Sequence, residues 1–373
     1  MKPFLVTLGL ALLAQAQAAP PTELPPPAPG GHIELSAAAR DGAGQLVLAW
    51  TQVGRSRTVH AAQWVPPGRG QPGHWRALGG SLNEDARFNA AQLQARTDHV
   101  GRVWLGWAED AAGAHVDSWL MAVWDGRGWR RPVSAVRRNL SDAGRSRAFD
   151  VLPGGVPTLA WTDIHAPGAW GAAIRPLVWD GRTWQPQNVL SRLSGAGFGP
   201  DLRTGRDGRR VLAFLEGDYA TMNVVVLAED PAGHWTRLGG PLNRHPGTFA
   251  ADLSLRLSPW GQAQIAWAEA DPGGGPDQIQ VGRWTGTRWA GLGGPLGRGT
   301  GHAGHPQLAQ TRSGEVRVAW LQDGQPHAAR WTGQRWAALS LPHMAHATGL
   351  SLSDDGSALA VSDGGRLRVW RWD

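Results

Sequence analysis

Carboxylates that recur along the chain are the residues best suited to chemistry. A first set lies at the start of expected strands and consists of Asp150, Asp201 and Asp252. A second set lies behind the first and consists of Asp163, Glu216 and Glu269. Hard oxygen ligands of this kind suit calcium, so the first set is the candidate metal site. Two alternatives stay open: the acids accept backbone amide hydrogens and join neighbouring units, or a pair about 5 to 9 Å apart cleaves glycosides.

Aromatic residues break the regular pattern at one place in three consecutive units. With the polar residues beside them they form a candidate ligand site, which consists of Trp119, Trp170, Tyr219, His165, Asp163 and Glu216. A sugar stacks its apolar ring face on an aromatic side chain while its hydroxyl groups form hydrogen bonds, so this mixture predicts a glycan site. The alternative is that the aromatic side chains cover long loops.

Histidines form a further irregular set of two His-x-x-His pairs in adjacent loops. The pairs are His302 with His305 and His343 with His346. Imidazole nitrogens bind transition metals, but these pairs lack the helical spacing that makes such motifs specific. We therefore expect no cofactor apart from calcium at the acidic set.

The elements that position these residues follow from an internal repeat. Apolar runs end at Trp50, Trp107, Trp161, Phe214, Trp267, Trp320 and Val361, with spacings of 57, 54, 53, 53, 53 and 41 residues. An acid or an amide follows each of these ends two residues later. A period of this size is typical of arrays in which one structural unit is copied around a ring.

Each unit contains four short strand-like segments, as residues 249–296 illustrate. Glycine-rich turns separate segments of about five residues without helical periodicity, which is typical of a four-stranded antiparallel blade. The chain is therefore predicted to be all-β, with a single seven-bladed β-propeller over residues 19–373. The expected blades cover residues 32–83, 88–140, 147–193, 199–243, 249–297, 304–341 and 347–373.

Tryptophans also recur in the third and fourth segments, and this regularity predicts packing between blades. The fourth unit departs from it. Phe214 replaces the tryptophan of the second segment, and residues 227–230 stand where the third-segment tryptophan is expected.

The seventh unit stops at Asp373 before a fourth strand. An offset of 315 residues aligns Leu24 with Leu339, which lies in the fourth segment of the sixth unit. Residues 21–27 are therefore predicted to supply the outer strand of the last blade. Prolines are tolerated in an outermost strand, and this closure removes the open edge of the ring.

Residues 1–18 resemble a secretory signal peptide, with Lys2, an apolar stretch from Phe4 to Leu13 and a small-residue end at Ala16–Ala18. We expect a secreted or periplasmic monomer with no integral membrane span. The chain has no cysteine, so it forms no disulfide. Its net charge of +6 is spread without basic runs among aromatic residues, which argues against a nucleic-acid partner.

Two stretches carry a resemblance to a known group of proteins. Val318–Trp336 and Trp235–Asn243 resemble the V-A-W-x-E and R-W-x-G-x-x-W-x-x-L-G-G-x-L-N repeats of secreted bacterial β-propeller proteins. These are grouped with sialidase-like, kelch-like and WD-repeat propellers, and the resemblance implies the architecture without an agreed activity.

We expect a non-catalytic binding module, with a glycan or an envelope protein bound on the face at the channel mouth. One alternative is a carbohydrate-active hydrolase or lyase that uses carboxylates at the channel mouth. Another is a structural or assembly scaffold of the cell envelope.

Overall fold

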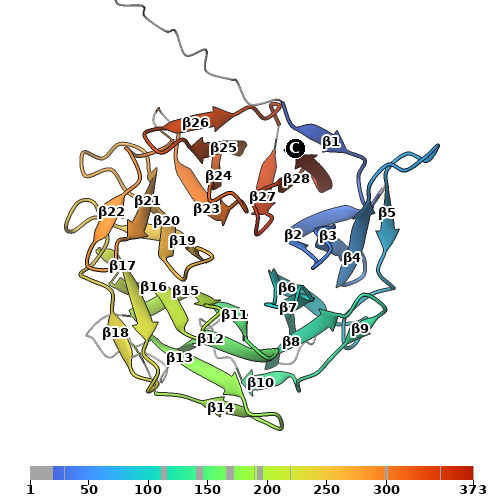
Figure 1. Cartoon of the computed structure of the whole chain (residues 1–373), viewed down its shortest axis with the longest axis horizontal. Helices are drawn as coiled ribbons and strands as arrows, with labels where there is room; N and C mark the ends of the chain where they lie inside the picture. Colours follow the sequence, from blue (N-terminus) through green and yellow to red (C-terminus); the bar gives the residue numbers. More distant parts are fainter. Residues whose placement is uncertain are drawn as a thin grey trace, which may run out of the picture.

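The computed structural model describes residues 20–28, 30–110, 116–139, 146–164, 172–188, 190, 196–218, 220–297, 299, 301–344 and 346–372. Seven antiparallel sheets follow one another around a ring in these residues (Figure 1). The prediction of an all-β, seven-bladed propeller is confirmed. No helix among the described residues is long and apolar enough to cross a membrane.

The strands are numbered along the chain, and β1 (Thr22–Leu24) precedes the first complete blade. Blade one comprises β2 (His32–Arg40), β3 (Leu46–Val53), β4 (Arg57–Val65) and β5 (His74–Ala77). Blade two comprises β6 (Asn89–Thr97), β7 (Val103–Asp110), β8 (Val116–Trp124), β9 (Trp129–Arg130) and β10 (Val136–Asn139). Blade three comprises β11 (Arg147–Leu152), β12 (Val156–Ile164), β13 (Ala172–Trp179) and β14 (Trp184–Pro186).

Blade four comprises β15 (Ala196–Thr204), β16 (Arg210–Gly217), β17 (Met222–Glu229) and β18 (Trp235–Arg237). Blade five comprises β19 (Ala250–Leu257), β20 (Ala263–Glu269), β21 (Gln278–Trp284) and β22 (Trp289–Gly291). Blade six comprises β23 (Ala303–Gln310), β24 (Val316–Gln322), β25 (Gln325–Trp331) and β26 (Trp336–Leu339). Blade seven comprises β27 (Ala347–Leu352), β28 (Ala358–Asp363) and β29 (Arg366–Arg371) together with β1.

The first strand of each blade lies nearest the centre of the ring, and the last strand lies on the rim (Figure 1). Six blades have the expected four strands. Blade two differs, because β9 and β10 both pair with β8 and together form its outer edge.

The ring closes through the N-terminal segment, as predicted. Strand β1 pairs antiparallel with β29, so that Leu24 lies opposite Val369. Leu24 is buried, and the Glu23 carboxylate accepts two hydrogen bonds from Arg368 at 2.8 and 2.9 Å. Blade one also binds this N-terminal segment, because the Trp75 indole donates a hydrogen bond of 2.7 Å to the Pro25 carbonyl.

Hydrophobic clusters of the described residues lie between neighbouring blades, one at each of the seven interfaces. Tryptophan pairs from the third and fourth strands border these clusters, with ring centroids 5.3 to 5.6 Å apart. The pairs are Trp64–Trp75, Trp124–Trp129, Trp179–Trp184, Trp284–Trp289 and Trp331–Trp336. The fourth-strand indoles also donate to carbonyls of the preceding blade, for example Trp129 to Leu78 at 2.7 Å. The repeated tryptophans therefore hold each blade to the one before it.

Candidate functional site

The three aspartates predicted to bind calcium lie at three different levels of the innermost strands. Asp201 lies opposite Ala213, and Ala148 and Ser254 occupy the same level in blades three and five. Asp150 lies two residues beyond this level, whereas Asp252 sits in a β-bulge before it, with a φ of 40°. The spacing along the chain explains this difference. The aspartates recur every 51 residues, whereas the ends of the apolar runs, Trp161, Phe214 and Trp267, recur every 53. The three acids therefore do not lie at one level of the channel.

Each of these aspartates joins its blade to the next one. Asp150 accepts a hydrogen bond of 2.6 Å from the Thr204 amide, and Asp201 accepts one of 2.8 Å from the Leu255 amide. Asp252 accepts one of 2.9 Å from the His305 amide. No group of three or more His, Cys, Asp or Glu side chains that could hold a metal ion occurs among the described residues. The geometry favours the alternative that the acids fix neighbouring blades together.

Glu269 of the second set binds the segment that leads into its blade. Glu269 accepts hydrogen bonds from the Trp267 indole and the Arg244 amide, both at 2.9 Å. Glu109 occupies the equivalent position in blade two and binds the Trp107 indole at 2.7 Å. Burial raises the pKa of Glu109, and these hydrogen bonds oppose that shift. Glu269 and Glu109 thus have the same structural role at equivalent positions of the repeat.

Glu216 is the exception, because the residue two before it is Phe214 and a phenyl ring has no N–H to donate. Its Oε2 atom pairs with Arg237 at 2.5 Å instead. Its Oε1 atom is buried without a hydrogen-bond partner among the described residues. Asp163 lies in β12, at the corresponding position of blade three.

One aromatic residue of the predicted ligand site, Trp119, lies in the core and not on a surface. Trp119 lies within β8 and is only 1% exposed, with its ring centroid 6.2 Å from that of Phe149. It belongs to the core between blades two and three, so its assignment to the ligand site is wrong. Trp170, His165 and Tyr219 lie outside the described residues.

The two histidines of the first His-x-x-His pair lie beside different acids. The imidazole of His302 lies 3.2 Å from Asp277, and that of His305 lies 3.3 Å from Asp252. The two histidines therefore have different acidic neighbours, and the described residues give no shared metal site.

Calcium is expected to leave the melting temperature of the protein unchanged, and a chelator is expected to have no effect. The carboxylate of Asp201 already pairs with Arg203 at 2.6 Å and accepts a backbone amide, so a cation would have to displace both. Thermal unfolding with calcium and with chelator measures this. A rise in melting temperature that Asp201→Asn abolishes would restore the predicted calcium site.

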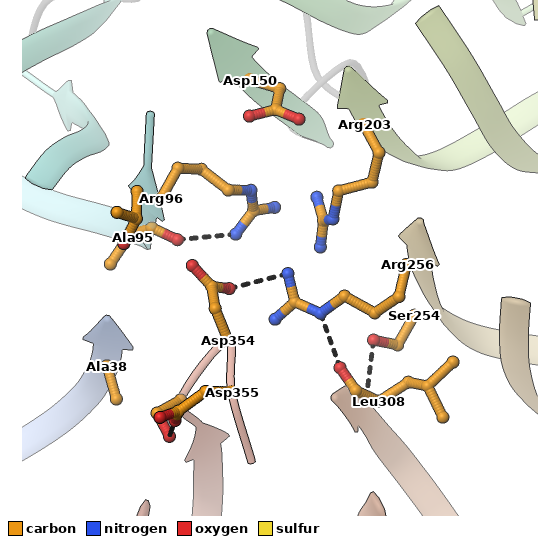
Figure 2. Close-up of polar contacts among 12 residues, drawn as sticks. Ala38, Ala95, Arg96, Asp150, Arg203, Ser254, Arg256, Leu308, Asp354 and Asp355 are labelled. Carbon is orange, nitrogen blue, oxygen red and sulfur yellow. Dashed lines mark hydrogen bonds and ion pairs between the residues drawn. The ribbon is translucent and has the colours of Figure 1, made fainter. Parts of the chain in front are cut away.

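The central channel contains a cavity of about 300 Å³ that is lined by residues of the innermost strands. Three arginines from three blades point toward one another across it: Arg96 from β6, Arg203 from β15 and Arg256 from β19 (Figure 2). Arg256 pairs with Asp354 at 2.7 Å. Arg96 and Arg203 share the carboxylate of Asp201, at 3.4 and 2.6 Å.

Burial and charge shift the titration of two groups in this channel. Burial raises the pKa of Asp150, although the charges of Arg203 and Arg96 act in the opposite direction. The pKa of the Arg203 guanidinium is lowered to about 9, first by burial and then by the charge of Arg96. The channel is therefore a place where positive charges are brought close together away from water.

A second irregular feature lies on the rim between blades three and four. Glu229 stands opposite Trp235 in the β17–β18 hairpin, where five other blades place a tryptophan pair. Arg210 begins β16, at a position that is a buried apolar residue in blades one, two and six. Two charged residues thus replace two apolar ones at the same interface.

These two residues form a buried ion pair. The Arg210 Nε atom donates to Glu229 Oε2 at 2.6 Å, and Arg210 Nη2 also binds Glu229 Oε1. Arg210 reaches blade three as well, where it donates to Thr158 at 3.1 Å and to the Gln187 side chain at 2.7 Å. Its guanidinium lies 5.2 Å from the centre of the Trp235 ring. All three nitrogens of the buried guanidinium donate to a partner, so the charged pair can be accommodated at this interface.

A cavity of about 700 Å³ lies beside this ion pair, and we call it the Trp235 cavity. Its lining includes Gln187, Asn188, Leu227, His234, Trp235 and Arg237. Trp235 is partly exposed, whereas His234 and Asn188 are exposed. An aromatic ring, an apolar side chain and several hydrogen-bonding groups therefore face one space, whose volume lies in the usual range for ligand sites.

The sequence contained a signal for this cavity, because the loss of a tryptophan in blade four is visible in the repeat. The compensating residues were not visible. Gln187 and Arg210 are distant from Glu229 along the chain, and only the closed ring brings them together.

Comparisons with known proteins give the fold and no family. No family model matches the chain, and no curated protein matches it. Among solved structures, an ulvan lyase of a polysaccharide lyase family is similar with a TM-score of 0.57, at 14% identity over 94% of this chain and 96% of that one. An α-L-arabinofuranosidase from Fusarium graminearum gives a TM-score of 0.55 at 10% identity, over 81% of this chain and 92% of that one.

An α-L-arabinanase from Penicillium chrysogenum is similar with a TM-score of 0.51 at 12% identity, over 96% of this chain and 98% of that one. At these identities the similarity establishes a common fold. The chain is thus a seven-bladed β-propeller that is structurally similar to several carbohydrate-active enzymes.

Proposed function

We propose that the protein is an exported, non-catalytic carbohydrate-binding module whose ligand occupies the Trp235 cavity. The observation that carries this proposal is the broken tryptophan pair of blade four. In five other blades the third-strand indole packs against the fourth-strand indole. In blade four Glu229 stands in place of the third-strand indole and pairs with Arg210, and the cavity of about 700 Å³ lies beside Trp235. The other blades form the same interface without an ion pair at these positions, so the repeat does not require this change.

The chemistry of the cavity suits a sugar. The indole of Trp235 offers an apolar surface, and Arg210 above it holds the ring in place. Gln187, Asn188 and His234 supply groups that hydrogen-bond to hydroxyls. An aromatic surface with a few polar groups around it is the usual composition of a saccharide site.

Two further observations support the proposal. Solved structures with the same fold include an ulvan lyase and an arabinanase, so carbohydrates are ligands of this architecture elsewhere. The signal-like segment at residues 1–18 supports export, which would bring the module into contact with extracellular or envelope glycans.

Replacing Trp235 with alanine is expected to weaken glycan binding about tenfold or more, because a stacked aromatic contributes on the order of 1 kcal/mol beyond the area it buries. The purified protein would first be screened on a broad glycan panel, and the best hit would then be titrated calorimetrically against Trp235→Ala. Trp260→Ala is the matched control, since Trp260 is 83% exposed at the β19–β20 turn and lies outside the cavity.

Other outcomes identify other functions. Equal affinity of Trp235→Ala and the unaltered protein would remove the ligand from the cavity, and loss of binding in Trp170→Ala would return it to the channel mouth. Capture of an envelope protein instead of a glycan would favour the scaffold alternative. Release of shortened or unsaturated sugars from the hit would make the protein an enzyme.

A further inference from the structure

Three guanidinium groups meet in the channel at one level of the innermost strands. These are Arg96, Arg203 and Arg256, which lie opposite Trp104, Val211 and Gln264 on the second strands of their blades. Each of these opposite residues stands three positions before the end of its apolar run. Blades one and six have Ala39 and Ala309 at this level. The repeat therefore does not require arginine there.

The charges of these groups are only partly matched by the acids around them. Arg256 forms an ion pair with Asp354, whereas Arg96 and Arg203 both pair with Asp201. Asp150 lies beside Arg203 on the neighbouring blade (Figure 2), but its carboxylate accepts hydrogen bonds from the amides of Val151 and Thr204.

Two donors in this cluster are buried without a hydrogen-bond partner among the described residues: the Nε atoms of Arg96 and Arg203. The Arg203 side chain is 8% exposed and the Arg96 side chain 13%. A buried donor on a charged group is expensive to leave unmade, so a folded protein normally satisfies it. Both arginines line the cavity of about 300 Å³, which has room for roughly ten waters at about 30 Å³ each.

We propose that the channel binds an oxyanion, a carboxylate, sulfate or phosphate group, between Arg96, Arg203 and Arg256. Arginine presents N–H donors in a planar fork that matches the oxygens of such groups. The anion accepts hydrogen bonds from guanidinium N–H groups that face the cavity and lowers the repulsion among three like charges. It is either a free ion or a substituent of a larger ligand such as an acidic sugar. This site is separate from the Trp235 cavity and does not depend on the proposed function.

The test compares sodium sulfate, sodium phosphate and an acidic oligosaccharide with sodium chloride at equal ionic strength. Screening of the protein's charges is then the same in each solution, so a difference reports binding. Thermal unfolding and calorimetric titration are the readouts. Arg96→Gln is expected to weaken anion binding about tenfold or more, since a charge-assisted hydrogen bond contributes about 1.5–3 kcal/mol. It leaves Asp201 paired with Arg203. Arg335→Gln is the matched control, because Arg335 is exposed on the β25–β26 turn.

A second variant changes the affinity in the opposite direction. Asp150→Asn removes a negative charge beside Arg203 and is expected to tighten anion binding about tenfold. Circular dichroism and the melting temperature establish that each variant is folded before binding is compared. Trp235→Ala is expected to leave anion binding unchanged.

The outcomes separate the two sources of the anion and decide the proposal. Binding of inorganic sulfate or phosphate that Arg96→Gln weakens supports a free ion. Binding of the acidic oligosaccharide alone, again weakened by Arg96→Gln, supports a sugar-borne group. The proposal is overturned if none of the three binds beyond the chloride control, or if Arg96→Gln and Arg335→Gln bind equally well.

Discussion

A chain that lacks residues 21–27 is expected to lose on the order of 5 kcal/mol of its free energy of unfolding. Leu24 is 6% exposed and belongs to the cluster between blades seven and one, and removing a buried leucine side chain costs about 2–5 kcal/mol. The β1–β29 ladder and the hydrogen bond from Trp75 to Pro25 are lost as well, at about 1 kcal/mol each. Typical domains have about 5–15 kcal/mol in total, so the loss is a large share.

Urea unfolding followed by tryptophan fluorescence measures this effect. Leu24→Ala is expected to give about half of it, and Glu23→Ala well under 1 kcal/mol, because the pair of Glu23 with Arg368 is partly exposed. A synthetic peptide covering residues 19–31 should restore stability to the shortened chain when added in excess. A shortened chain as stable as the full one would show that β29 needs no partner at the ring closure.

The fold was predictable because each blade contains the same local signals. An apolar run that ends two residues before an acid or an amide occurs seven times, and a tryptophan pair occurs in five blades, so single departures do not obscure the pattern. Closure was predictable for the same reason, since Leu24 stands where the repeat places a fourth-strand leucine. The double outer edge of blade two was not, because β9 has only two residues and no distinct pattern precedes β10.

The site was less predictable, because side-chain neighbours depend on register. The β-bulge at Asp252 and the drift of two residues per blade changed which acids share a level. Trp119 breaks the repeat in the sequence, yet its place within β8 directs it into the core. Arg96, Arg203 and Arg256 keep the spacing of the repeat, so their common level could be read from the sequence. Their ion pairs with Asp201 and Asp354 could not, since these join different blades and only the closed ring brings them together.

Replacing Arg210 with methionine is expected to destabilise the protein by about 3–5 kcal/mol, because Glu229 would remain buried without its partner. Methionine keeps most of the side-chain volume, so the loss reflects charge more than packing. The hydrogen bonds of Arg210 to Thr158 and Gln187 are lost in the same step, which loosens blade three from blade four. Chemical denaturation measures the change, and Arg288→Met on the exposed β21–β22 turn is the matched control.

The double variant Arg210→Val with Glu229→Trp restores the pattern of the other blades and tests why blade four departs from it. A buried ion pair can often be replaced by well-packed apolar residues with a neutral effect or a gain of about 1–4 kcal/mol, so this variant should recover the stability that Arg210→Met loses. The new indole would pack against Trp235 as Trp284 packs against Trp289, and would occupy space beside the cavity. Full stability combined with lost glycan binding would mean that the ion pair is retained for the ligand site. A double variant that is less stable than Arg210→Met would instead assign the ion pair a structural role that a tryptophan pair cannot fill at this interface.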